Sequence, residues 1–541
     1  MIVPAPVPAP ARRPATLGVA ALVTTASALA LATALRLPAA WSSGDALNHV
    51  SGAWLALAED LAHGTFYRPL VDPALGTGGT RFFPLLFSLH AALRTAGADL
   101  LAAGYLLSLA SGLSVLAGVY ALARGCGRGP PIAAALAVLA FAALAPQEAL
   151  TSARGDLLPV GLSALGLALL AGIPDRVRTR LVLAVLAFGL AFAAKPTALT
   201  APAAGAAWLL LRGDRRAAVA LATGVAALAA AVVGAADALS DGRFLALLAA
   251  CAAGGAGPAD LLRGPARLVG ELVHEDRAGI VLLCAGLAAA LAAAPGHLRA
   301  ARTGPLAPAA LPALWLLAAL AGAVVVFSSP GTTSNHLIEA EAASAAAFAG
   351  AWEAGRRARW VARALAPLAA VAGLAAALHL GAVDHRDSTR LRDLRAVSAW
   401  LPPGSILSED PLLPLLRGER PYLLDPFMLR LAAARDAGVA QPLEQRLRSR
   451  SFAAVVLYWD LDDPEFARWY SKVHLGEGVA AAIRGAYEPV RRIGRYVLYL
   501  PRAQGTPQPA WPRPVVANDR PSTPARGTLR VRGPTLRMSG E

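Results

Sequence analysis

Two positively charged residues stand where a cation could bind an anion. Lysine occurs only twice, at Lys195 and Lys472, whereas arginine is frequent. Lys195 lies in the apolar segment FAAKPTALT without an acidic neighbour, so its ammonium group either extends to the polar interface or binds an anion. Arg154 and Asp156 lie in SARGDLL, before another apolar segment. They are either a simple ion pair at a helix start, or an anion site. In such a site Arg154 would bind the anion through two N–H groups, and Asp156 would orient the guanidinium group.

Acidic and histidine residues at other segment ends are candidates for proton transfer or for lining a cavity. Asp45, in WSSGDALNH, is either a helix N-cap or a carboxylate that accepts a proton or holds a metal ion. His49 follows four residues later and would share a helical face with Asp45. His336 and Glu339, in SNHLIEAEAA, are three residues apart and could both face a cavity, whereas Asn335 is explained by helix capping.

The composition places these residues in a membrane protein. The chain has 541 residues, of which 56% are hydrophobic and only 16% are charged. Soluble proteins carry roughly a quarter charged residues. The net charge of +15 could suggest nucleic acid binding, but the arginines form short clusters between apolar runs. That arrangement is typical of membrane topology signals, so we expect no nucleic acid partner.

Apolar stretches of near-spanning length predict about eleven transmembrane helices. They lie at 16–35, 99–123, 131–147, 156–173, 181–195, 197–211, 217–239, 278–295, 307–327, 336–354 and 361–380. The stretch 181–211 is divided in two because Pro196 removes a backbone donor. The first stretch could instead be a signal peptide, but the many spans that follow favour an uncleaved helix.

Arginine clusters mark every second connection, starting at the N-terminus. The positive-inside rule therefore places residues 1–15 in the cytoplasm of a bacterial inner membrane and the region after the last span outside the cytoplasm. The first outer loop, 36–98, contains two segments that we expect to lie at the membrane surface, 49–62 and 82–96.

A soluble composition follows the last predicted span. Short β-like runs occur at 405–407, 422–424, 452–458 and 496–500, with helix-like stretches between them. The predicted fold class is therefore mainly α, a polytopic helical bundle over 16–380 with a small extracytoplasmic α/β domain over 381–502. Residues 503–541 are rich in proline, arginine and glycine, which predicts a disordered tail.

Four segments together resemble a known family pattern. They are WSSGDALNH, SARGDLL, FAAKPTALTAP and GTTSNHLIEAEAA. The pattern is similar to that of the GT-C superfamily of membrane glycosyltransferases, in the branch of protein O-mannosyltransferase-like and aminoarabinose-transferase-like enzymes, and it covers mainly residues 15–380. The resemblance implies an integral-membrane enzyme that uses a dolichyl- or polyprenyl-phosphate-linked sugar. It also implies an acidic residue at the active centre in the first outer loop, and Asp45 matches that position.

On this interpretation, Lys195 and Arg154 bind the donor phosphate and Asp45 deprotonates an acceptor hydroxyl. The remaining candidates, Asp156, His49, His336 and Glu339, would line the cavity. The expected partners are the lipid-linked donor, membrane lipids and a glycan, lipid or protein acceptor. No cofactor follows from the sequence, and a divalent metal ion stays open. The alternative is a multi-helix transporter or lipid flippase without transferase activity, although the chain lacks the internal repeat often found in transporters.

Overall fold

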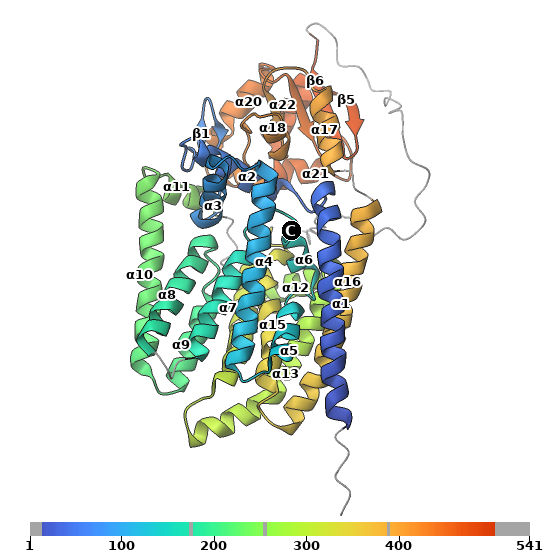
Figure 1. Cartoon of the computed structure of the whole chain (residues 1–541). Coiled ribbons are helices and arrows are strands. Elements are labelled where there is room, and N and C mark those ends of the chain that lie inside the picture. The colour runs from blue at the N-terminus through green and yellow to red at the C-terminus, as the bar shows by residue number, and fades with distance from the viewer. Residues whose placement is uncertain (1–12, 173–176, 253–256, 330, 387–389, 504–541) are drawn as a thin grey trace, which may run out of the picture.

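Long helices run along a common axis, and a smaller α/β unit covers one end of them (Figure 1). The computed structural model describes residues 13–172, 177–252, 257–329, 331–386 and 390–503. The predicted disordered tail lies almost wholly outside the described residues, as does most of the predicted cytoplasmic segment 1–15. The start of helix α1, Arg13–Ser43, and the C-terminal unit lie at opposite ends of the bundle.

The predicted spans coincide with helices of the bundle. These helices are α1, α4 (Leu100–Gly125), α5 (Pro130–Leu139), α6 (Leu144–Ala149), α7 (Leu157–Ala171), α8 (Val177–Ala194), α9 (Thr200–Leu211), α10 (Arg215–Leu239), α13 (Arg277–Thr303), α14 (Leu311–Val326), α15 (Ile338–Ala351) and α16 (Arg356–Arg386). Within the described part of the chain, six helical segments are long and apolar enough to cross a membrane by themselves. The predicted fold class, a mainly helical multi-pass membrane protein, is confirmed.

The predicted span 131–147 is divided into two short helices, α5 and α6. The carboxylate of Asp276 explains where α6 begins, because its Oδ2 accepts hydrogen bonds from the backbone N–H groups of Leu144 and Ala145 at 2.8 and 2.9 Å. Its Oδ1 accepts a third bond, from Gly279 at the start of α13. One buried acid thus satisfies free donors at two helix starts, and the loop that follows α6 carries Arg154 and Asp156.

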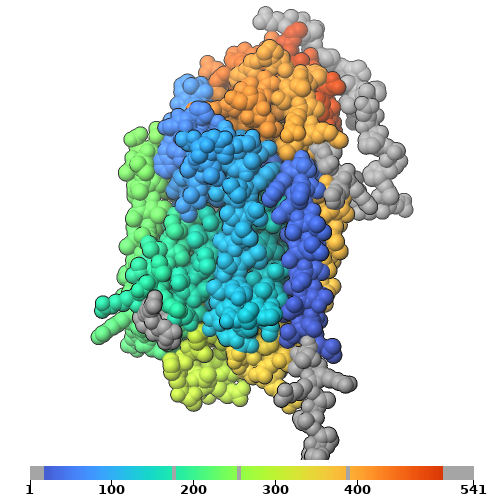
Figure 2. Space-filling model, in the orientation of Figure 1, coloured from blue at the N-terminus to red at the C-terminus, as the bar shows by residue number. Residues whose placement is uncertain are grey.

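The first outer loop contains α2 (His49–Ala62), α3 (Pro84–Thr95) and the two-residue strands β1 (Val71–Asp72) and β2 (Gly76–Thr77). The expectation that 49–62 lies on the membrane surface is wrong, since every residue from Ser51 to Ala58 is buried. The C-terminal unit packs on α2 so closely that a Cβ at Gly52 would lie 2.9 Å from the backbone nitrogen of Leu412. Figure 2 shows this loop, in light blue, seated against the orange C-terminal unit.

The long connection between α10 and α13 forms α11 (Arg243–Ala250) and α12 (Pro258–Glu275). The C-terminal unit has six α-helices around a four-stranded sheet. The helices are α17 (Arg390–Trp400), α18 (Leu412–Leu416), α19 (Pro426–Ala433), α20 (Gln441–Arg448), α21 (Ala467–Trp469) and α22 (Glu477–Ala486). The strands are β3 (Ile406–Ser408), β4 (Ala454–Leu457), β5 (Tyr487–Ile493) and β6 (Tyr496–Pro501), in the order β3-β4-β6-β5. Only β3 and β4 are parallel.

Three of the four predicted strands are present. The run 422–424 forms no strand of the sheet; Leu423 instead makes an isolated bridge with Thr77 of the first outer loop. Strand β5 was not predicted, because Pro489 and two arginines interrupt its apolar alternation and leave much of it exposed. The fourth strand of the sheet, β5, is thus held by backbone hydrogen bonds to β6 and has no apolar alternation that the sequence could reveal.

Candidate active site

The carboxylate of Asp156 gathers polar groups from three segments of the chain. Its Oδ1 accepts hydrogen bonds from Lys195 Nζ at 2.8 Å and from Asn335 Nδ2 at 2.9 Å. Arg154 Nε lies 3.5 Å from Oδ2. Asp156 occupies the N-cap position of α7 but makes no side-chain capping bond. The acid therefore does not cap the helix, and its carboxylate contacts two cations and an amide.

Local backbone structure places each of these side chains. Lys195 follows the last residue of α8, and its N–H still bonds to Ala191 O, so the side chain leaves the helix at its end. Pro196 cannot continue that hydrogen-bond pattern. Asn335 lies in a short 3-10 turn, Ser334–His336, before α15. The three segments meet at the end of the bundle that adjoins the outer loops.

The cations keep hydrogen-bonding capacity for a ligand. The ammonium group of Lys195 has three N–H donors, of which the bond to Asp156 uses one. Arg154 donates from Nε to Ser152 Oγ at 3.0 Å, and within the described residues no hydrogen bond engages its terminal amino groups. Burial by itself would raise the pKa of Asp156, but Lys195 and Arg154 hold it below its ordinary value. Asp156 is thus ionised at neutral pH and orients both cations.

His336 and Arg81 adjoin this cluster. Burial, with a smaller effect of the charge of Lys195, lowers the pKa of His336 to about 3, so the imidazole is neutral at pH 7. Arg81 also contributes to this effect and is therefore a third cation near the cluster. Arg81 is not among the predicted site residues, and its only signal in the sequence is its position in the glycine-rich segment GTGGTR of the first outer loop. Asn335, which the sequence suggests as a helix-capping residue, binds Asp156 instead.

Asp45 lies in a different polar environment. The structure begins the following helix at His49, with Asn48 as its N-cap, so Asp45 is no N-cap and shares no helical face with His49. Asp45 Oδ1 accepts the backbone N–H of Arg390 at 3.3 Å, whereas its Oδ2 is buried without a hydrogen-bond partner. Burial raises the pKa of Asp45 to about 6, against a smaller opposing effect of the bond from Arg390.

Among the described residues, no hydrogen bond or ion pair joins Asp45 to Arg154 or Lys195. The two regions nevertheless adjoin the same chain segment. Arg36 pairs with Asp384 at 2.6 Å, and the charge of that acid contributes to the raised pKa of Asp45. Arg36 also donates to Thr151 Oγ1, three residues before Arg154. The segment that follows α6 therefore carries Arg154 of the cation cluster and is linked through Arg36 to Asp384, whose charge acts on Asp45.

His49 and Glu339 have partners outside the cluster. The ring of His49 lies 6.1 Å from that of His474 in the C-terminal unit, and burial lowers its pKa. Glu339 Oε1 accepts bonds from Thr200 Oγ1 at 2.5 Å and Trp315 Nε1 at 3.0 Å, which joins α9, α14 and α15. His336 precedes α15, so the expected common α-helical face of His336 and Glu339 is not formed.

No group of three or more histidine, cysteine, aspartate or glutamate side chains is arranged to hold a metal ion in the described part of the chain. The cluster around Asp156 has a net positive charge and N–H donors, and it is therefore suited to an anion. Its chemistry is that of a phosphate or carboxylate site.

Comparison with known proteins shows the fold. No family model matches the sequence, and no curated protein matches it significantly. The structure of ArnT from Cupriavidus metallidurans bound to undecaprenyl phosphate is similar, with a TM-score of 0.54 and 16% identity, over 88% of this chain and 99% of that chain. The Archaeoglobus fulgidus oligosaccharyltransferase in its apo form matches with a TM-score of 0.51 and 14% identity, over 91% of this chain and 75% of that chain. The expected GT-C-like fold is confirmed.

Proposed function

We propose that this protein transfers a sugar from a polyprenyl-phosphate donor to an acceptor hydroxyl. The observation that carries the proposal is the placement of Lys195 and Arg154 around Asp156, at the end of a GT-C-like bundle. The similar ArnT structure holds undecaprenyl phosphate, the chemical class of ligand that two adjacent cations would bind. The comparisons offer no support for the alternative, a transporter or flippase.

The proposed reaction is a single displacement. The acceptor oxygen forms a bond to the anomeric carbon of the sugar while the bond from that carbon to the phosphate oxygen breaks. The electron pair of the broken bond remains on the lipid phosphate, where Lys195 and Arg154 stabilise the developing charge. Asp156 takes no part in the bond changes; it positions the two cations.

Asp45 is the proposed general base. A base acts best when its pKa is near the working pH, and a value of about 6 satisfies that condition. The unpartnered Oδ2 could accept the proton of the acceptor hydroxyl. This role requires the acceptor to bind beside the segment after α6, between Asp45 and the cations. The C-terminal unit, whose Arg390 contacts Asp45, would then help to select the acceptor.

The proposed location is the bacterial inner membrane, with the N-terminus in the cytoplasm and the site on the periplasmic face. The support is the arginine clusters at every second connection of the chain. Possible acceptors are a glycan, a lipid or a protein hydroxyl.

Purified protein in detergent, given a radiolabelled polyprenyl-phosphate sugar and candidate acceptors, tests the proposal. We expect labelled product from the wild type and at least about 10²-fold less from Asp45→Asn or Lys195→Ala. Lys472→Ala is the matched control, because Lys472 is the only other lysine and forms an exposed pair with Glu477. Normal turnover by folded Asp45→Asn and Lys195→Ala would contradict the proposed roles. Transport across sealed vesicles without product would contradict the proposed reaction.

A further inference from the structure

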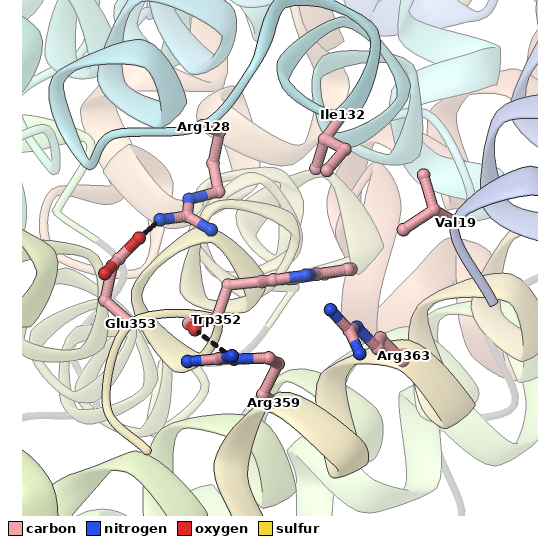
Figure 3. A pocket seen from close by; sticks show the side chains of 7 residues that line it. All are labelled: Val19, Arg128, Ile132, Trp352, Glu353, Arg359 and Arg363. Atoms are coloured by element: carbon pink, nitrogen blue, oxygen red, sulfur yellow. Dashed lines mark hydrogen bonds and ion pairs between the residues drawn. The ribbon is translucent and has the colours of Figure 1, made fainter. Parts of the chain in front are cut away.

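A second cationic site lies at the end of the bundle opposite to the C-terminal unit. A cavity of about 320 Å³ opens there between the start of α1, the connection from α4 to α5, and the connection from α15 to α16. Figure 3 shows three arginines around it, Arg128, Arg359 and Arg363, with Trp352 between them. Helix α1 begins at this end and finishes at Ser43 beside the outer loops, so the cavity is separated from the Asp156 cluster by the length of the bundle.

The positive charge of this cavity is only partly neutralised. Arg128 forms an ion pair with Glu353 and donates to Cys126 O at 3.3 Å from both Nε and Nη2. Arg359 donates from Nε to the backbone oxygen of Trp352 at 3.1 Å. Arg363 Nε is buried and has no hydrogen-bond partner. Among the described residues, neither Arg359 nor Arg363 has a carboxylate partner, so two guanidinium groups face the cavity unpaired.

Nearby residues place the cavity at the level of lipid headgroups. Trp360, one residue after Arg359, is 71% exposed, and Leu17, two residues before the lining residue Val19, is 69% exposed. An exposed tryptophan beside exposed aliphatic side chains is typical of the membrane–water interface. The cavity lining therefore combines the three arginines with the apolar side chains of Val19 and Ile132 (Figure 3).

The approach of α1 to α16 fixes the position of Arg363. A Cβ on Gly18 would lie 3.1 Å from Arg363 O and 3.2 Å from Arg363 Cβ, so the two helices touch at this point. This helix contact holds the backbone of Arg363 in place, and the guanidinium group lies near the indole of Trp352 (Figure 3). A group placed in this way is prepared to bind an anion without a large loss of side-chain freedom.

We propose that this cavity binds a phosphate group at the membrane surface, such as the headgroup phosphate of an anionic phospholipid. Guanidinium groups bind phosphate oxygens through paired N–H donors. Arg359 and Arg363 supply these donors, and Val19 and Ile132 contact the upper part of the lipid chains. This site is independent of the glycosyl transfer proposed above, which concerns the other end of the bundle.

Arginines at this end also act as topology signals, and two of them provide a matched control. Arg356 and Arg357 lie on the first turn of α16, are exposed and do not line the cavity. The Arg356→Gln/Arg357→Gln double variant removes the same charge as Arg359→Gln/Arg363→Gln, but it leaves the cavity intact. A difference between the two variants would report the site and not the general surface charge.

The experiment measures binding of radiolabelled phosphatidylglycerol to the purified full chain in zwitterionic micelles. A direct guanidinium hydrogen bond to the phosphate contributes about 1 kcal/mol, which is about a fivefold change in affinity. We expect Arg359→Gln/Arg363→Gln to lose two such contacts and bind the lipid about 25-fold more weakly, and Arg356→Gln/Arg357→Gln, which loses none, to bind it within about twofold of wild type. If the first double variant does not fold, the single variants should each lose about fivefold.

A second arm replaces the lipid with inorganic phosphate and follows the rise in unfolding temperature. Protection by phosphate that is lost in Arg359→Gln/Arg363→Gln would support a phosphate site that also accepts a soluble ligand. Binding of the lipid alone would assign the site to a headgroup. Equal losses in both double variants, or no binding of either probe by the wild type, would overturn the proposal.

Discussion

Lys195 Nζ lies 2.8 Å from Asp156 Oδ1, and this contact joins the end of α8 to the start of α7. The two side chains are 19% and 10% exposed, so little water screens the pair. Each group lowers the cost of placing the other at the membrane boundary. The pair still leaves two ammonium donors and the terminal groups of Arg154 for a ligand, which is why we assign a positioning role to Asp156.

Removal of the Asp156 charge should destabilise the fold. In Asp156→Asn the ammonium of Lys195 and the guanidinium of Arg154 lose their common counter-ion in a largely buried site. Breaking a buried ion pair by changing one partner costs about 3 kcal/mol or more. We expect a lower unfolding temperature in detergent and weaker binding of the donor lipid. Glu477→Gln, which breaks the exposed pair with Lys472, should cost at most about 1 kcal/mol. Equal stability of the two variants would contradict this account.

Asp45→Asn should stabilise the protein while it removes activity. The folded-state pKa of Asp45 is about 6, above its ordinary value of 3.8, so the folded protein binds more protons than the unfolded chain between these values. Stability should therefore fall as pH rises from about 4 to 6, and Asp45→Asn should lose that dependence. Unfolding temperatures of both proteins, measured across this pH range, check the sign. A variant less stable than wild type at pH 7 would contradict it.

Ionisation of Asp45 should also determine how kcat/KM decreases at acidic pH. A general base must be ionised, so kcat/KM of the wild type should fall tenfold per pH unit below about pH 6. Residual activity of Asp45→Asn, where measurable, should lack this decrease. An unchanged decrease in that variant would assign the titration to another group.

Lys195→Ala should reduce the chemical step. If the ammonium stabilises the departing phosphate, kcat and kcat/KM should both fall, by about 10²–10³-fold. A change in KM for the donor alone would show that Lys195 contributes only to ground-state binding. Steady-state kinetics over a range of donor concentrations separate the two results.

Arg390 should anchor the C-terminal unit beside Asp45. Its Nη2 donates to Asp410 Oδ2 at 2.6 Å and to the Tyr458 hydroxyl at 3.1 Å, within a fully buried site. Arg390→Ala would leave Asp410 buried with Tyr496 and Leu412 as its remaining donors, at a cost of about 3–5 kcal/mol. Arg392→Ala is the control, because Arg392 lies on the same helix and is 72% exposed. Thermal unfolding compares the stability of the two variants. Equal unfolding temperatures would show that the contacts of Arg390 with Asp410 and Tyr458 do not stabilise the protein.

The sequence by itself determined the membrane class and the positions of the helices. Hydropathy is a local property, so each apolar run indicates its own helix without knowledge of its neighbours. It also indicated Asp156, Arg154 and Lys195 as unusual, because charge at the edge of an apolar run has a cost that requires a partner.

Only the tertiary structure decided which partners these groups have. The counter-ion of Lys195 comes from 39 positions away, and the acid that begins α6 comes from more than 130. Burial of α2 depends on the C-terminal unit, which no local pattern in 49–62 reveals. Likewise, Arg359 and Arg363 resemble ordinary topology signals in the sequence, and only the packing of α1 on α16 places them at one cavity. Hydrophobicity acts on each segment separately, whereas hydrogen bonds and ion pairs form only between groups that the completed fold brings within a few ångströms.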